Sequence, residues 1–242
     1  MLELGTGWFP VIPVYYYLNG ADNIYTIDHN PLLFPKNVKA TIAKFLSYSK
    51  SGKLDMFNKN PVNERLKNLQ DIFKKIGSLP LDRIMEEINI RTIVGDASNL
   101  DIATRSVDLI CSNNTFEHIS PEILEKILKE FKRIIVRNGV MSHFIDMTDH
   151  FEHIDKSITI YNFLKFSDKK WKLINNSIQP QNRERITFYR ELYNKLGIEL
   201  DEEISKSGDV EAVRKINLDK QFSYFSPDEI AVYHSLLISH IK

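Results

Sequence analysis

The chain is short of several features that mark specialised protein classes. It has one cysteine, Cys111, among 242 residues, which excludes an internal disulfide framework and a multi-cysteine zinc site. It has no uninterrupted apolar run of about 18 residues, so a transmembrane helix is not expected. It has no internal repeat with a period of about 20–50 residues, which excludes solenoids and propellers. What remains is an ordinary globular chain with 43% hydrophobic and 26% charged residues.

The chain also lacks an excess of either charge, because 32 Lys and Arg residues balance 32 Asp and Glu residues. A formal net charge of zero argues against a large phosphate-binding surface, so nucleic acid is not an expected partner. The first residues lack the charged and apolar segments of a secretion signal. Together with the single cysteine, these features predict a reduced, cytoplasmic protein.

Strand-like and helix-like segments alternate over the first part of the chain. The strand-like runs are rich in β-branched residues and end at glycine or polar turns; they cover residues 1–4, 24–27, 90–94, 107–111 and 140–146. Between them lie helical patterns, of which residues 121–135 have the clearest apolar stripe. The pair Asn138-Gly139 is expected to form the turn before the last of these strands. This alternation predicts βαβ units around a parallel sheet.

The rest of the chain differs in composition. Residues 34–88 are mostly helical in pattern, with a polar loop over residues 49–63. Residues 147–182 are rich in aromatics, Lys, Asn and His, and we expect a mainly helical cap there, with Tyr161, Phe163, Phe166 and Trp171 as its own core. A helix followed by a short strand at residues 198–200 is expected next.

Near the end of the chain, Ser226 before Pro227 and two acidic residues predicts the start of a helix.

The first two chemical signals are a glycine turn and an acid. Gly5 and Gly7 follow a strand directly, and glycine lets a ligand approach the backbone closely. Asp28 ends the next strand, 28 − 7 = 21 residues after Gly7. A carboxylate at about this spacing can accept two hydrogen bonds from ribose hydroxyls.

Two further signals follow later strands. Asp96 and Ala97 come after the third strand, where a carboxylate can accept from an exocyclic amine and the next N–H can face a ring nitrogen. The polar run of residues 112–118 follows the fourth strand. Parallel strands of an open α/β sheet bind ligands at their carboxyl ends. Each signal alone is also compatible with ordinary turn chemistry, but in this order they predict a nucleoside-binding site.

The order of these motifs resembles that of class I S-adenosylmethionine-dependent methyltransferases. The likeness covers residues 1–146 and is greatest to the type 11-like methyltransferases that act on small molecules, lipids or glycans. It implies an α/β fold, a Rossmann-like three-layer sandwich with a mostly parallel central sheet. Residues 1–146 would be the cofactor-binding core, and residues 147–242 the acceptor-side cap and the completion of the fold.

The resemblance also implies roles for individual residues. S-adenosyl-L-methionine would be the cofactor, with its ribose on Asp28 and its adenine at Asp96 and Ala97. Asn113 would lie beside the transferable methyl group. Glycine turn residues would border the methionine part, and His29 would frame the cofactor edge. The expected cofactor-binding set is therefore Glu3, Gly5, Thr6, Gly7, Asp28, His29, Asp96, Ala97 and Asn113.

The chain departs from the family pattern in two places. The usual Pro-Gly-Gly before the fifth strand is replaced by Arg137-Asn138-Gly139, which still favours a turn. The chain also begins inside the first motif, where relatives have a longer strand and upstream helices. We therefore expect that a form extended at its N-terminus would bind the cofactor more tightly, and equal affinity would contradict this.

Methyl transfer to a hydroxyl group needs a base, and histidine suits that role near neutral pH. Three histidines that follow the fourth and fifth strands are the expected catalytic residues: His150, His118 and His153. His143, in the middle of a strand, is expected to be a core residue. Arg183 and Arg185 are candidates for binding an anionic acceptor through bidentate hydrogen bonds, although a solvated helix face is the simpler explanation of both.

The run from Asp149 to Asp155, with His150 and His153 inside it, also has the spacing of a metal cluster. Surface histidines commonly bind nothing, so no metal is expected.

Three other functions are alternatives to methyl transfer onto a small molecule or glycan. A nicotinamide-dependent oxidoreductase would need a third glycine in the turn, but Pro10 stands at that position in this chain. A methyltransferase that acts on nucleic-acid bases would need an amine-selecting tetrad after the fourth strand, and this chain does not have one. A non-catalytic, cofactor-binding domain that acts through a partner stays open.

The sequence thus favours methyl transfer to a small-molecule or glycan-like acceptor, with oxygen as the expected nucleophile. The oligomeric state is left open.

Overall fold

The computed structural model describes residues 1–56, 61–175 and 180–242. These residues divide into two compact units. Unit 1 consists of Met1–Leu100 and Leu109–Cys111, and unit 2 of Asp101–Asp108 and Ser112–Lys242. The strands follow the order β3-β2-β1-β4-β5-β7-β6 in a seven-stranded, mostly parallel sheet. The predicted Rossmann-like α/β class is therefore confirmed, while the domain boundary expected after residue 146 stays a prediction.

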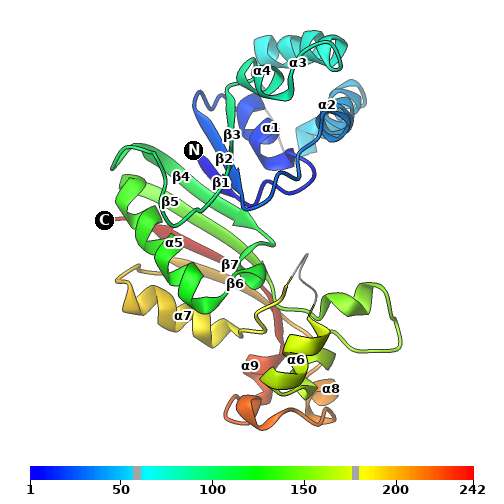
Figure 1. Cartoon of the computed structure of the whole chain (residues 1–242), viewed down its shortest axis with the longest axis vertical. Helices are drawn as coiled ribbons and strands as arrows, with labels where there is room; N and C mark the ends of the chain where they lie inside the picture. Colours follow the sequence, from blue (N-terminus) through cyan, green and yellow to red (C-terminus); the bar gives the residue numbers. More distant parts are fainter. Residues whose placement is uncertain (57–60, 176–179) are drawn as a thin grey trace. The chain divides into compact units, whose positions relative to one another are not determined.

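Unit 1 is built on three parallel strands, β1 (Leu2–Leu4), β2 (Ile24–Asp28) and β3 (Ile90–Val94). Helix α1 (Val11–Leu18) connects β1 to β2, and Pro10 precedes its first turn (Figure 1). These four elements lie where the sequence predicts them, because their apolar runs are bounded by glycine, proline and Asn-Gly signals.

The long connection from β2 to β3 is helical, as expected for residues 34–88. It contains α2 (Pro35–Lys50), η1 (Lys53–Met56), α3 (Asn63–Lys75) and α4 (Leu81–Glu86). The expected polar loop over residues 49–63 begins later than predicted, because α2 continues to Lys50 and η1 follows it. Residues 57–60 of that loop lie outside the described part of the chain. The helices bury one apolar cluster, which includes Val14, Ile42 and Ile72.

Unit 2 contains most of the second half of the chain. Strand β4 (Val107–Asn113), of which Leu109–Cys111 belong to unit 1, is followed by η2 (Phe116–His118), α5 (Pro121–Ile134) and β5 (Ile135–Asp146). Helix α5 buries the predicted apolar stripe, including Leu124, Leu128 and Phe131. That stripe decides its position, because burial of one face supplies most of the stability of an amphipathic helix.

The predicted turn at Asn138-Gly139 is wrong, because both residues lie inside β5. The Asn138 N–H donates to the carbonyl of Ile241 at 2.6 Å, and Gly139 accepts from the Ile241 N–H at 2.9 Å. Asn138 has a φ of 65°, and a Cβ on Gly139 would lie 2.6 Å from the Ile135 side chain. The Asn-Gly signal therefore marks a local irregularity that hydrogen-bonds to the end of the chain.

Two strands complete the sheet of unit 2, and the sequence analysis placed neither. β7 (Val232–His240) pairs antiparallel with β5, and β6 (Glu202–Ser207) pairs antiparallel with β7. The strand expected at residues 198–200 is wrong; the chain becomes a strand only at Glu202. β6 is almost entirely exposed, so it lacks an apolar alternation, and β7 buries Ser235 and Ser239 among its apolar residues.

Six short helices of unit 2 contribute to a small core of their own. They are η3 (His150–His153), η4 (Asn162–Lys165), α6 (Asp168–Ile174), α8 (Val210–Arg214), η5 (Lys220–Phe222) and α9 (Pro227–Ala231). Helix α7 (Ile186–Lys195) buries Ile186, Tyr189, Leu192 and Tyr193 outside this cluster. Trp171, Val213 and Ile230 bring α6, α8 and α9 into one apolar cluster, and these helices gather together in Figure 1. Tyr161 and Phe163 belong to the same cluster and Phe166 packs against it, so the predicted core of the cap is confirmed.

Among the described helices, none is long and apolar enough to cross a membrane.

Candidate functional site

The glycine turn after β1 has the backbone geometry that the sequence predicts. Gly5 and Gly7 have φ angles of 88° and 60°, a region that disfavours other residues. The Gly5 N–H donates to the carbonyl of Ile27 at 2.8 Å, which fixes the turn against the end of β2. A Cβ on Gly7 would meet nothing within 4 Å, so the turn leaves open space beside its backbone.

Asp28 joins this turn to the end of β2. Its Oδ2 accepts a hydrogen bond from the Gly7 N–H at 2.9 Å, and its Oδ1 accepts one from the Asn30 N–H at 3.1 Å. Each carboxylate oxygen has two lone pairs, so these bonds leave acceptor capacity. Asp28 can therefore order the glycine turn and also accept hydrogen bonds from a diol.

Glu3 is buried beneath the turn, with 4% of its surface exposed. The Thr26 hydroxyl donates to Glu3 Oε2 at 2.7 Å, and the Thr6 and Thr26 hydroxyl oxygens lie 2.6 Å apart. Burial raises the pKa of Glu3 to about 8; the Thr26 bond lowers it, and the charge of Asp28 raises it further. A cation that reached this carboxyl group would favour its ionised form.

The residues after β3 lie beside Asp28. The Gly95 N–H donates to the Asp28 carbonyl at 3.0 Å, and Asp96 follows directly. Asp96 Oδ1 accepts from the Ser98 N–H at 2.8 Å, and Ala97 is buried. His29 is exposed next to Asp28. Unit 1 thus brings together the expected cofactor residues Glu3, Gly5, Thr6, Gly7, Asp28, His29, Asp96 and Ala97.

Asn113, the remaining member of the expected set, belongs to unit 2. It ends β4 and its side chain is exposed.

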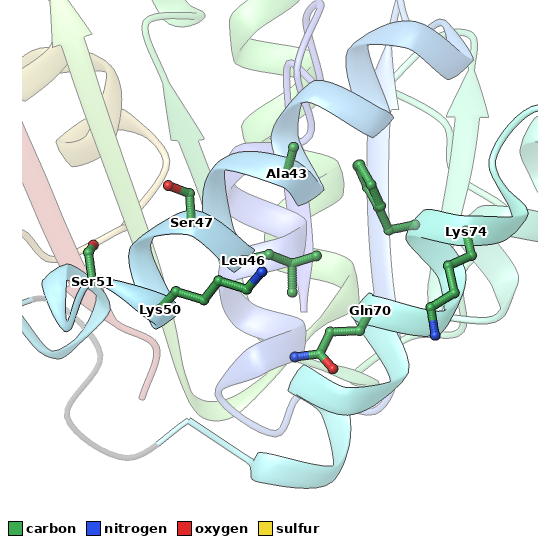
Figure 2. A pocket seen from close by; sticks show the side chains of 8 residues that line it. Ala43, Leu46, Ser47, Lys50, Ser51, Gln70 and Lys74 are labelled. Atoms are coloured by element: carbon green, nitrogen blue, oxygen red, sulfur yellow. The ribbon is translucent and has the colours of Figure 1, made fainter.

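A hollow of about 730 Å³ lies elsewhere in unit 1, between α2 and α3 (Figure 2). Its polar lining comes from Ser47, Lys50, Ser51, Gln70 and Lys74. None of the expected cofactor residues lines it, so this hollow takes no part in the candidate site.

In unit 2, the expected catalytic residue His118 ends the short helix η2. Its Nδ1 lies 2.8 Å from the carbonyl oxygen of Pro180. A carbonyl oxygen can only accept, so Nδ1 carries the proton and donates it, and Nε2 of the neutral ring has a free lone pair. Burial lowers the pKa of His118, while the Pro180 carbonyl acts in the opposite direction.

His150 begins η3, after the end of β5, and its ring centroid lies 5.1 Å from that of His118. Its Nε2 lies 3.6 Å from Oδ2 of Asp146, and the other oxygen of Asp146 lies 3.4 Å from Nε2 of His234. His153 lies further along η3, with its ring centroid 5.8 Å from that of His150. The structure therefore brings the three expected catalytic histidines into one group, with Asp146 beside it.

His143 is a core residue, as expected. It is fully buried, stacks on Phe116 at 4.4 Å between ring centroids, and lies within 2.8 Å of the Ser112 hydroxyl.

Glu117 was not predicted, and it is the most unusual group of unit 2. Only 3% of its surface is exposed, and neither carboxylate oxygen has a hydrogen-bond partner of normal geometry among the described residues. Burial raises its pKa well above the usual value, and the charge of Asp146 adds to this; the nearby backbone N–H groups of Glu117 and Asp146 act in the opposite direction. The only signal in the sequence is its position beside His118.

Arg183 and Arg185 do not point to an acceptor. Both are buried, with 4% and 1% of their surfaces exposed. The Arg183 guanidinium donates to the carbonyls of Phe163 and Phe166 and pairs with Asp168. The Arg185 guanidinium donates to the carbonyls of Met147, Ile230 and Val232. The terminal nitrogens of both guanidinium groups are used inside unit 2, while Nε of Arg185 is buried without a partner among the described residues. This argues against the interpretation of these arginines as acceptor-binding residues.

The residues just before these arginines connect the two histidine segments. Gln181 accepts from the His150 N–H at 3.1 Å and donates to the Thr148 carbonyl at 2.8 Å. Asn182 donates to the carbonyls of Phe116 and Ile119, on either side of Glu117 and His118. Pro180 to Asn182 therefore hold the loops that follow β4 and β5 in fixed positions.

Comparison with known proteins agrees with the fold. Residues 80–139 match the family described as Methyltransferase domain. A solved SAM-dependent methyltransferase from Methanosarcina mazei is 11% identical, with a TM-score of 0.53; the match covers 99% of this chain and 91% of that one. No curated protein sequence matches the chain.

Two other solved structures are similar over the whole chain. The PH0226 protein from Pyrococcus horikoshii OT3 is 16% identical, with a TM-score of 0.50, over 100% of this chain and 81% of that one. Geranyl diphosphate C-methyltransferase from Streptomyces coelicolor A3(2) was solved with Mg²⁺, geranyl diphosphate and S-adenosyl-L-homocysteine. It is 9% identical, with a TM-score of 0.53, over 100% of this chain and 71% of that one. At such low sequence identities, the likeness shows that the fold is shared and nothing further.

The matched segment and the fold agree with each other. Both are similar to those of class I methyltransferases.

Proposed function

We propose that this protein transfers the methyl group of S-adenosylmethionine to an oxygen atom of a small-molecule or glycan-like acceptor. The observation that carries the proposal is the joining of three strand ends in unit 1: Asp28 binds the Gly7 N–H and its carbonyl accepts from Gly95. This arrangement puts a diol acceptor, a close-approach turn and a second acid, Asp96, at the carboxyl ends of adjacent parallel strands.

The expected roles in cofactor binding follow from these positions. Asp28 accepts from the ribose hydroxyls, and Asp96 and Ala97 bind the adenine. The glycine turn borders the methionine part, with the buried carboxyl of Glu3 beneath it. Thr6 holds that carboxyl indirectly through Thr26. We keep His29 and Asn113 in the proposed set because each directly follows or ends a strand.

Methyl transfer does not require a covalent intermediate with the protein. The sulfonium makes the methyl carbon electrophilic, so the enzyme must align a nucleophile with the C–S bond and exclude water. A hydroxyl group must also lose its proton, and His118, His150 and His153 are the proposed catalytic residues. They follow the carboxyl ends of β4 and β5, as the acceptor side of the reaction requires.

The cofactor assignment is tested by calorimetry with S-adenosylmethionine and nicotinamide dinucleotides in parallel. Asp28→Ala should weaken S-adenosylmethionine binding by about 100-fold or more, because two charge-assisted hydrogen bonds contribute about 1.5–3 kcal/mol each. The matched control is Asp22→Ala, an exposed acid in the same unit that pairs with Arg65. Unchanged affinity in Asp28→Ala, or binding of the dinucleotide instead, would contradict the assignment.

The acceptor side is tested by turnover. His150→Ala should reduce methyl transfer by about 100-fold or more, as expected for loss of a group that assists proton transfer, and should leave the affinity for S-adenosylmethionine unchanged. Release of S-adenosylhomocysteine over a panel of hydroxyl acceptors measures the rate. An unchanged rate would remove His150 from the reaction. Cofactor binding without turnover on any acceptor would instead favour the non-catalytic alternative.

A further inference from the structure

We propose that Glu117, His118 and His150 bind a divalent first-row transition metal ion. Each offers one ligand atom, and these atoms lie within 4.8 Å of one another. Zinc-to-ligand distances are about 2.0–2.2 Å, so ligand atoms around one ion lie up to about 4 Å apart. A small convergence of the side chains is enough to complete the site. The proposal rests on the proposed function and gives two of its histidines a specific role.

The strongest sign of a cation site is the carboxyl group of Glu117. A buried carboxylate ordinarily accepts hydrogen bonds, yet both oxygens of Glu117 lack a partner of normal geometry among the described residues. Only 3% of the surface of Glu117 is exposed. An unpaired buried charge is costly, whereas coordination of a cation gives such a carboxylate the partner it needs.

The surroundings of the two histidines are those of metal ligands. Ligand imidazoles typically donate their other N–H to a carbonyl or carboxylate oxygen, which fixes the tautomer and the ring orientation. The His118 Nδ1 donates to the Pro180 carbonyl at 2.8 Å. The His150 Nε2 faces Asp146 Oδ2 at 3.6 Å. His118 therefore has one nitrogen fixed on a carbonyl oxygen and a second nitrogen for the ion, and a carboxylate lies near one nitrogen of His150.

The structure does not use the cluster that the sequence suggests. The acids of the run from Asp149 to Asp155 serve local turns: Asp149 accepts from the Phe151 N–H at 2.9 Å, and Asp155 accepts from the Ser157 N–H at 2.9 Å. His150 instead meets Glu117 and His118 from the loop after β4. The expectation of no metal is therefore replaced by a site that joins two loops distant in the sequence.

The donor set indicates the kind of ion and its use. Two imidazoles and one carboxylate suit Zn²⁺, Mn²⁺, Fe²⁺ or Co²⁺ better than Mg²⁺ or Ca²⁺, which prefer oxygen ligands. Three protein ligands leave a position for the acceptor oxygen. There a bound ion would lower the pKa of the hydroxyl, whose proton would leave to solvent. His118 and His150 would then assist this step as ligands of the ion and not as bases. The oxygen then bonds to the methyl carbon, and the C–S bond breaks with its electron pair on sulfur.

The test titrates the metal-free protein with Co²⁺ and follows the visible absorption of the bound ion, with Zn²⁺ as a competitor. One equivalent of Co²⁺ should bind per chain. Glu117→Gln and His118→Ala should each weaken binding by at least about 10–100-fold. Loss of a group that only hydrogen-bonds to a metal ligand already has an effect of this size, and these residues are proposed as ligands themselves. Glu117→Gln keeps the shape of the buried side chain, and circular dichroism checks that both variants fold.

Two histidine variants are the matched controls. His153→Ala and His240→Ala should bind Co²⁺ like the unmodified protein, because neither residue belongs to the ligand cluster. Absence of saturable Co²⁺ binding would overturn the proposal. So would binding that survives Glu117→Gln but is lost in His153→Ala, since this would place the ion on η3.

The same samples separate this proposal from the proposed function. Calorimetry with S-adenosylmethionine on the metal-free protein tests the cofactor site alone. If Co²⁺ binds but S-adenosylmethionine does not, the metal site stands and the methyltransferase proposal fails. If S-adenosylmethionine binds and Co²⁺ does not, the reverse holds.

Discussion

At the scale of single residues, Glu3 has the most consequential environment in unit 1. It lies beneath the turn that the proposal assigns to the methionine part of the cofactor, and burial raises its pKa to about 8. At neutral pH this carboxyl group is therefore mostly protonated in the cofactor-free protein. Binding of the cationic cofactor stabilises the ionised form, so binding and proton release are coupled.

We predict that S-adenosylmethionine binding releases most of one proton per chain at pH 7, and that affinity rises with pH toward 8. Calorimetry in two buffers of different ionisation enthalpy measures the released proton. Glu3→Gln should abolish the buffer dependence, whereas Glu64→Gln, an exposed acid of α3, should retain it. A binding enthalpy of the unmodified protein that is the same in both buffers would contradict the coupling.

The same raised pKa sets the sign of the pH dependence of stability. The folded state binds the Glu3 proton more tightly than the unfolded state, whose pKa is near 4.5. This contribution is fully present below pH 4.5 and is lost as pH rises toward 8. Glu3→Gln should therefore flatten the decline in the free energy of unfolding over that range, as urea denaturation at several pH values will show.

At the scale of elements, helix caps show where the same sequence signal has two different outcomes. Ser226 and Ser120 both precede a proline at the start of a helix. Ser226 forms a capping box with Glu229, in which each side chain satisfies the backbone N–H of the other. Ser120 makes no side-chain cap hydrogen bond. Only the first is expected to stabilise its helix through the serine hydroxyl.

Ser226→Ala should therefore reduce the free energy of unfolding by about 1 kcal/mol, the usual effect of losing an N-cap side chain. Ser120→Ala is the matched control and should change it by less than about 0.5 kcal/mol. Chemical denaturation of both variants measures the difference. Equal effects would mean that the capping box of α9 contributes nothing specific.

At the scale of the whole molecule, unit 2 depends on a buried charge that connects distant segments. The Arg185 guanidinium binds the carbonyls of Met147, Ile230 and Val232, so it joins the ends of β5, α9 and the start of β7. Burial lowers the pKa of Arg185 to about 10, which still leaves it charged at neutral pH. Carbonyl oxygens from three segments replace the water that this charge has lost.

Arg185→Lys should destabilise the protein by about 3 kcal/mol, because a lysine cannot reproduce the planar fork and leaves buried carbonyls unpaired. Arg190→Lys is the control: its side chain is 46% exposed and pairs with Glu203, so its loss should cost less than about 1 kcal/mol. Thermal and urea unfolding measure both. Unchanged stability in Arg185→Lys, with weaker acceptor binding, would restore the acceptor role that the structure argues against.

The sequence by itself determined the parts of the fold that depend on neighbouring residues. Local apolar periodicity and turn residues determine β1 to β3, α1 and α5. The order of Gly5, Asp28 and Asp96 predicts the proposed cofactor site at the strand ends. β7 was missed because its buried serines break the apolar pattern, and β6 because an exposed edge strand needs no apolar face. These assignments depend on pairing partners that are distant in the sequence.

Only the tertiary structure decided which polar groups meet. Glu117, His118 and His150 come from two segments separated by α5 and β5, and no local pattern indicates that they lie together. The role of Arg185 could not be predicted either, because a charged side chain is expected at the surface unless its buried carbonyl partners are known. Burial and partners are properties of the folded chain: the same carboxyl or guanidinium group is solvated, paired or a ligand according to what the fold brings beside it.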